Sequence, residues 1–176
     1  MRVAIARGWQ AEGTEISSAA VRFMRERGLT AHAGELERLA LPSAAFDAAV
    51  LNHVLEHVRN PVATLAEVRR LLVPGGLARI EVPNLASLSS RAKNLQSRLG
   101  LKRDPWKHYS TGHHFWFFTP GTLARTLRTA GLEGVALDAP ARQWNARGAG
   151  DGVANALYGV TRWGGHLVAW ARRSGS

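Results

Sequence analysis

Apolar residues follow two different spacings along this chain, and the change between them predicts strands that alternate with helices. The run 46–51 is short and almost wholly apolar, which is typical of a buried strand in a parallel sheet. Asn60 and Pro61 then predict a helix start, and apolar residues recur at helical spacing until the Pro-Gly-Gly sequence 74–76. A second strand is expected at 77–82. These segments predict a parallel strand–helix–strand unit with chemistry at its strand ends.

The same reasoning predicts further elements on both sides of this unit. Strands are expected at residues 10–14, 29–33, 132–137 and 167–171. Helices are expected at residues 1–7 (the tail of a helix), 17–28, 85–99 and 119–131. In the helix 85–99 we expect Leu88, Leu95 and Leu99 to face inward. The alternation of strands with helices predicts an α/β fold.

The composition narrows the classes of function. With 176 residues, of which 45% are hydrophobic, the chain predicts one domain with a sizeable core. The absence of cysteine excludes disulfides and thiolate metal sites. The N-terminus shows no export signal, which predicts a cytoplasmic protein, and polar residues interrupt the apolar segment 153–170 too often for a membrane-spanning helix. The net charge of +10 comes mainly from arginine and does not require a nucleic-acid partner.

Three stretches of the sequence resemble the class I S-adenosylmethionine-dependent methyltransferases. The main stretch combines FDAAVLNHVLEHV at 46–58 with LLVPGG at 71–76 and VPN at 82–84. The resemblance extends upstream over 7–17 and downstream over 114–132. Each fragment alone is weak evidence, but their order and spacing together are specific.

The resemblance implies a fold, a cofactor and a reaction. The implied fold is a Rossmann-like, doubly wound, mostly parallel sheet with helices on both faces. We expect a single domain over residues 1–176, with 91–118 as a lid-like insert. The implied cofactor is S-adenosyl-L-methionine, and the implied partner is a small-molecule methyl acceptor. The alternative is a non-catalytic, degenerate methyltransferase fold that binds a partner through a basic surface.

The resemblance also implies residues that bind the adenosine half of the cofactor. Glu15 is expected to accept hydrogen bonds from both ribose hydroxyls, and Ile16 to pack against the adenine. Glu35 is expected to accept from the adenine amino group, and Leu36 to cover the ring. The alternatives are that Glu15 stabilises a helix N-terminus and that Glu35 is a solvated loop acid.

Asn52 and His53 follow the strand 46–51 and are expected to contact the methionine end of the cofactor or the methyl acceptor. His53, Glu56 and His57 also share a spacing that would gather them on one face of a helix. Ubiquinone-biosynthesis O-methyltransferases have an acid at the position of His53 and use a comparable cluster for a metal. Because that acid is replaced here, we predict no metal. We expect Glu56 and His57 to be structural and to tie the crossover helix to a neighbouring loop.

The segment 91–118 interleaves basic and aromatic residues and shows no regular period. As a lid over the acceptor, it would supply aromatic walls and a general base, because a histidine that is neutral near pH 7 can remove a hydroxyl proton. His113 and His114 are the main candidates for this base, and His108 is the third. The alternatives are a solvated loop whose aromatic residues fill the core, and methyl transfer by alignment alone, without a base.

A glycine-rich turn after a first strand, which the family uses to approach the cofactor, is missing before Glu15. Gly8 follows residues 1–7 too closely for a strand and a crossover helix, so we interpret 1–7 as the end of that helix. The missing strand would lie between the strands that end at Glu15 and Asn52. We therefore expect weak or absent cofactor binding by these 176 residues, and a low-micromolar dissociation constant would contradict this expectation.

Overall fold

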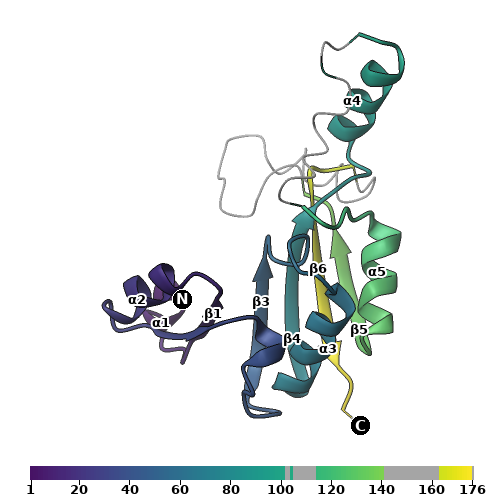
Figure 1. Cartoon of the computed structure of the whole chain (residues 1–176). Coiled ribbons are helices and arrows are strands. Elements are labelled where there is room, and N and C mark those ends of the chain that lie inside the picture. The colour runs from purple at the N-terminus through teal and green to yellow at the C-terminus, as the bar shows by residue number, and fades with distance from the viewer. Residues whose placement is uncertain (102–103, 105–113, 141–162, 176) are drawn as a thin grey trace. The chain divides into compact units, whose positions relative to one another are not determined.

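The computed structural model describes residues 1–101, 104, 114–140 and 163–175. The chain divides into two compact units, Met1–Pro42 and Ser43–Ser176, which are described separately below (Figure 1). No helix in the described part of the chain combines the length and the apolar character that a membrane crossing requires. The expectation of a single domain stays a prediction.

The first unit is a parallel strand–helix–strand arrangement with a short helix before it. Its elements are α1 (Arg2–Ile5), β1 (Glu12–Glu15), α2 (Ser18–Arg25), β2 (Thr30–Ala33) and the 3₁₀ helix η1 (Leu36–Arg38). β1 and β2 pair in parallel, with Glu15 opposite Ala33. The Ser17 hydroxyl accepts a hydrogen bond from the Ala20 amide and caps α2. The predicted strands and the helix between them are confirmed, and residues 2–5 are helical; that this helix is the tail of a longer one stays a prediction.

The second unit contains a four-stranded sheet. Its elements are β3 (Phe46–Asn52), α3 (Pro61–Leu71), β4 (Leu72–Pro83), α4 (Leu88–Arg98), α5 (Pro120–Thr129), β5 (Leu132–Asp138) and β6 (His166–Arg173). The strand order is β3-β4-β6-β5. β3 is parallel to β4, and β6 is antiparallel to both β4 and β5. β3, β4 and β5 therefore run in the same direction, and the predicted α/β, mostly parallel architecture is confirmed.

The junction between α3 and β4 is shorter than the sequence predicts. The Asn60 side chain caps α3 as expected, accepting from the Ala63 amide at 3.0 Å. The helix ends directly in β4, and the predicted break at residues 74–76 is a bulge inside that strand. Gly75 adopts a left-handed φ of 82° there, which favours glycine. β4 consequently spans 72–83 instead of the predicted 77–82.

α3 and α5 cover one face of the four-stranded sheet and contact each other (Figure 1). The buried side chains of these helices pack with alternate residues of the central strands. Fully buried residues include Leu65 and Leu123 from the helices and Ile80 and Leu167 from the strands. The residues of β4 that alternate with Ile80 face the other way. On that opposite face, Val50 and Trp170 flank Arg79 in the strand register and are partly exposed.

The predicted inward orientation of three leucines in α4 is wrong. Leu88, Leu95 and Leu99 are 48%, 58% and 62% exposed. Figure 1 shows α4 beyond the ends of the strands, and it makes few contacts with the other described helices and strands. The spacing of the leucines is that of an amphipathic helix, but about half or more of each side chain stays exposed.

Gly131, which follows α5, provides a first prediction. Its φ is +77°, and an added Cβ would lie 3.1 Å from Nε of Arg69. Gly131→Ala should therefore lower the free energy of unfolding by about 1–2 kcal/mol, because a left-handed backbone is unfavourable for alanine. Urea denaturation followed by circular dichroism measures the change. Gly121→Ala is the matched control, since Gly121 lies inside α5 with open space around it. An equally stable Gly131→Ala variant would contradict the prediction.

Candidate functional site

In the first unit, Glu15 and Ile16 lie where β1 ends and α2 begins. The Glu15 carboxylate accepts a hydrogen bond from the Ser17 amide through Oε1 at 2.9 Å. This contact at the start of α2 is the one that the helix-terminus alternative predicts. The neighbouring Ile16 side chain is 78% exposed. Contact of Glu15 with a ribose and of Ile16 with an adenine stays a prediction.

Glu35 and Leu36 follow the end of β2, beside the end of β1. The amide of Gly34 donates to the Glu15 carbonyl at 2.9 Å, which joins the two strand ends. The Glu35 carboxylate pairs with Arg38 at 3.0 Å, and both side chains are exposed. An exposed apolar side chain therefore lies at the same sheet edge as two accessible carboxylates. This set of groups fits an adenosine, which offers an apolar ring face together with hydroxyl and amino donors.

In the second unit, Asn52 and His53 end β3. Asn52 is exposed, and His53 adopts a left-handed φ of 52°. The His53 amide donates to the Glu81 carbonyl at 3.0 Å, and its Nδ1 lies 3.0 Å from Oε1 of Glu56. Residues 53–57 form a bend and a turn, not the helix that would gather His53, Glu56 and His57 on one face. The side chains still lie close together, with Nε2 of His57 3.9 Å from Oε1 of Glu56. Because the two units are described separately, proximity of Asn52 to Glu15 stays a prediction.

Glu56 ties this turn to the segment that begins at residue 114. Its side chain is buried, and its carbonyl accepts hydrogen bonds from the amides of Phe115 and Trp116 at 2.9 and 3.2 Å. The Trp116 indole donates to the Val58 carbonyl at 3.0 Å. His57 packs its ring edge-on to that of His114, with the centroids 4.8 Å apart. These contacts join the turn that precedes α3 to the segment at residues 114–116, whereas a tie from the crossover helix itself stays a prediction.

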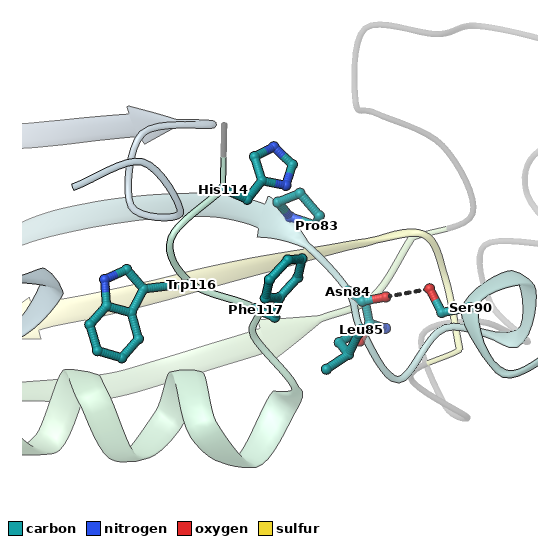
Figure 2. A pocket seen from close by; sticks show the side chains of 7 residues that line it. All are labelled: Pro83, Asn84, Leu85, Ser90, His114, Trp116 and Phe117. Carbon is teal, nitrogen blue, oxygen red and sulfur yellow. Dashed lines mark hydrogen bonds between the residues drawn. The ribbon is translucent and has the colours of Figure 1, made fainter. Parts of the chain in front are cut away.

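A pocket lies beyond the carboxyl end of β4 (Figure 2). Its volume is about 110 Å³, and its lining residues are Pro83, Asn84, Leu85, Ser90, His114, Trp116 and Phe117. Asn84 is held in place because its side-chain amide donates to the Gly164 carbonyl at 2.8 Å and its own carbonyl accepts from Ser90. His114 thus lies in a pocket, as a general base would need. His113 and His108 lie outside the described residues, so their predicted roles stay predictions.

The sheet brings Glu81 and His166 next to His53, and Arg79 next to Glu81, although none of these three was a predicted site residue. Glu81 is fully buried in β4, and its Oε2 accepts from Nη2 of Arg79 at 2.7 Å. Oε1 of Glu81 lies 3.9 Å from Nε2 of His53. The His166 ring meets the His53 ring edge-on, with centroids 5.2 Å apart. The available signals were an arginine and an acid inside the predicted strand 77–82 and a histidine directly before the predicted strand 167–171.

Burial changes the pKa of one side chain in this group, that of His166. The pKa of His166 is lowered, first by burial and then by the neighbouring His53, against the opposing effect of Glu81 and Glu56. A lowered pKa keeps the His166 ring neutral near pH 7.

Among the residues that the structure describes, two groups of three side chains have ligand atoms within 4.8 Å of one another and could hold a metal ion. The first group is His53, Glu81 and His166, and the second is Glu56, His57 and His114. Only the first contains residues that the sequence analysis did not consider.

We compared the chain with protein families and with known proteins. Residues 2–137 match the family described as "Methyltransferase domain". A curated relative, the ubiquinone biosynthesis O-methyltransferase of Dinoroseobacter shibae, is 31% identical over 116 residues, which cover 62% of this chain and 45% of the relative. A second relative of the same name, from Cereibacter sphaeroides, is 33% identical over 101 residues, or 56% of this chain and 39% of the relative. The chain thus spans less than half the length of these relatives.

Solved structures show the same fold. One of them is a SAM-dependent methyltransferase from Thermotoga maritima, described as a possible histamine N-methyltransferase. It superposes with a TM-score of 0.66 at 20% identity, and the match covers 98% of this chain and 77% of the Thermotoga chain. The fold agrees with the α/β architecture described above, and the sequence match covers most of the chain. The chain therefore belongs to the methyltransferase domain family.

Proposed function

We propose that the domain represented by this chain transfers a methyl group from S-adenosyl-L-methionine to a small-molecule acceptor. The observation that carries the proposal is the edge of the first unit, where Glu15, Ile16, Glu35 and Leu36 follow two paired parallel strands. Open α/β sheets bind ligands at the carboxyl ends of their strands. The names of the relatives, ubiquinone biosynthesis O-methyltransferases, favour an oxygen atom as the methyl acceptor.

In this proposal the strand-end residues hold the cofactor. The Glu15 carboxylate accepts from the ribose hydroxyls, while the exposed Ile16 side chain packs against one face of the adenine. Glu35 accepts from the adenine amino group, and Leu36 covers the ring. Asn52 and His53, at the end of β3, contact the methionine end or the acceptor. When bound, the cofactor supplies an electrophilic methyl group.

The pocket beyond β4 is the proposed acceptor site. Trp116 and Phe117 supply apolar walls that exclude water, and Asn84 supplies a fixed polar group (Figure 2). His114 is the proposed general base and would accept the proton of the acceptor hydroxyl. Its contact with the His57 ring restricts its orientation, which favours proton transfer in a defined direction.

Saturation-transfer NMR with S-adenosylhomocysteine tests the proposal, because this method detects millimolar dissociation constants. We expect saturation of the adenosine protons by the 176-residue chain, with an affinity weaker than low micromolar. Ile16→Asp should abolish the transfer, because a charged side chain would replace the apolar surface under the adenine. Val3→Asp is the matched control, since Val3 is also an exposed apolar residue of the same unit but lies on α1.

A negative result in this experiment would contradict the proposal. Absence of saturation transfer at millimolar ligand, with both variants folded, would contradict the cofactor role of this edge. It would favour the alternative function, a non-catalytic domain that binds a partner through its basic surface.

A further inference from the structure

Three side chains from distant parts of the second unit converge at one end of its sheet. Glu81 pairs with Val168 and Pro83 pairs with His166 in the β4–β6 register, so Glu81 and His166 are diagonal neighbours on one face. His53 follows β3, where its amide binds the Glu81 carbonyl. The ligand atoms of the three side chains lie within 4.8 Å of one another.

Two polar atoms in this group are buried and lack a hydrogen-bond partner among the described residues. These atoms are Oε1 of Glu81, whose side chain has no exposed surface, and Nδ1 of His166. A buried polar atom without a partner is unfavourable, so such atoms indicate a missing ligand or ion. A carboxylate oxygen and an imidazole nitrogen are both metal ligands.

Neighbouring side chains fix the orientation of His53 and Glu81, as the hydrogen-bond partners of metal ligands do in metal sites. The Glu56 carboxylate lies 3.0 Å from Nδ1 of His53, which favours a proton on Nδ1 and makes Nε2 the ligand atom. That Nε2 atom is the one 3.9 Å from Oε1 of Glu81. Arg79 holds the other oxygen, Oε2, at 2.7 Å and so directs Oε1 toward the histidines.

We propose that His53, Glu81 and His166 form a binding site for a divalent transition-metal ion of the zinc type. Two imidazole nitrogens and one carboxylate oxygen are a donor set that zinc accepts, and three protein ligands leave a fourth position open to water or a small molecule. Ligand atoms around tetrahedral zinc are about 3.3 Å apart, so the side chains need to close by roughly 1.5 Å at most. The site adjoins Pro83, which also lines the pocket beyond β4.

This proposal differs from the expectation of no metal that followed from the sequence. That expectation concerned His53, Glu56 and His57, whereas Glu81 and His166 become neighbours of His53 only through strand pairing. The second group, Glu56, His57 and His114, is the rival site for an added metal. There, Oε1 of Glu56 already contacts His53, Oε2 of Glu56 is buried without a partner among the described residues, as Oε1 of Glu81 is, and the His57 side chain is 42% exposed. The first group has two such buried, unpartnered atoms, which favours it over the rival.

Cobalt(II) binding to the full chain, freed of any purification tag and of metal, tests the proposal. We expect one Co²⁺ per chain, with visible d–d absorption that Zn²⁺ abolishes by displacement. His166→Ala and Glu81→Gln should each weaken binding at least about tenfold, because each removes a direct ligand. His57→Ala, which removes a ligand of the rival site, should bind as the wild type does, and His32→Ala controls for surface histidines.

A second measurement guards against loss of folding. Zn²⁺ should raise the Tm of the wild-type chain and of His57→Ala, but not that of His166→Ala. Absence of stoichiometric Co²⁺ binding to the wild type would overturn the proposal. So would weakening by His57→Ala with unchanged binding by His166→Ala, which would assign the metal to the rival site. The experiment involves neither cofactor nor acceptor, so its result is independent of the proposed methyl transfer.

Discussion

Replacing Leu65 by alanine should lower the free energy of unfolding by about 2–5 kcal/mol. Leu65 lies in the middle of α3 and is fully buried. α3 packs against β4, β5 and α5, so the truncation leaves a cavity where these elements meet. The cost combines the lost transfer of the side chain from water with the lost contacts around the cavity. Urea denaturation followed by tryptophan fluorescence measures the change in the midpoint.

Leu95→Ala provides the matched control for this prediction. The same atoms are removed from α4, but Leu95 is 58% exposed, so we expect a change of no more than about 0.5 kcal/mol. A similar loss of stability in both variants would mean that α4 is packed against the core. That result would contradict the arrangement of the second unit described here.

The comparison of α3 with α4 shows how far sequence patterns predict this fold. In α3 the cap at Asn60 and the apolar spacing predict the helix, and the flanking strands supply the surface that its apolar side chains need. The same spacing predicts the existence of α4 correctly but the burial of Leu88 and Leu95 wrongly. Periodicity reports which residues share a face, whereas burial depends on what lies against that face.

The residues of the candidate site likewise include some that the sequence predicts and some that it does not. Glu15 and Asn52 could be predicted because they lie at the ends of strands, and the position of a strand end is a local property of the sequence. Glu81 was missed because its neighbours, His53 and His166, lie 28 and 85 residues away along the chain and meet it only through strand register. A lone acid in an apolar strand does predict a buried partner, but the sequence does not indicate which residue that partner is.

Replacing Arg79 by methionine should lower the free energy of unfolding by about 3–5 kcal/mol in metal-free buffer. Arg79 donates to the Glu81 carboxylate at 2.7 Å, and Glu81 is fully buried. Methionine keeps much of the apolar length of the arginine but leaves a buried negative charge without its cation. The main cost is therefore the desolvated carboxylate, since the attraction between the two charges alone barely exceeds the cost of burying them.

A double-mutant cycle separates these two contributions. Glu81→Gln in the Arg79→Met background removes the unpaired charge, so the double variant should be more stable than Arg79→Met alone. Arg38→Met is the matched control, because Arg38 pairs with Glu35 at a similar distance of 3.0 Å on the exposed surface, where we expect a change below about 1 kcal/mol. If Arg79→Met cost as little as Arg38→Met, the Glu81 carboxylate would have to reach water. The structure would then not supply the buried, unpartnered oxygen from which the metal site is inferred.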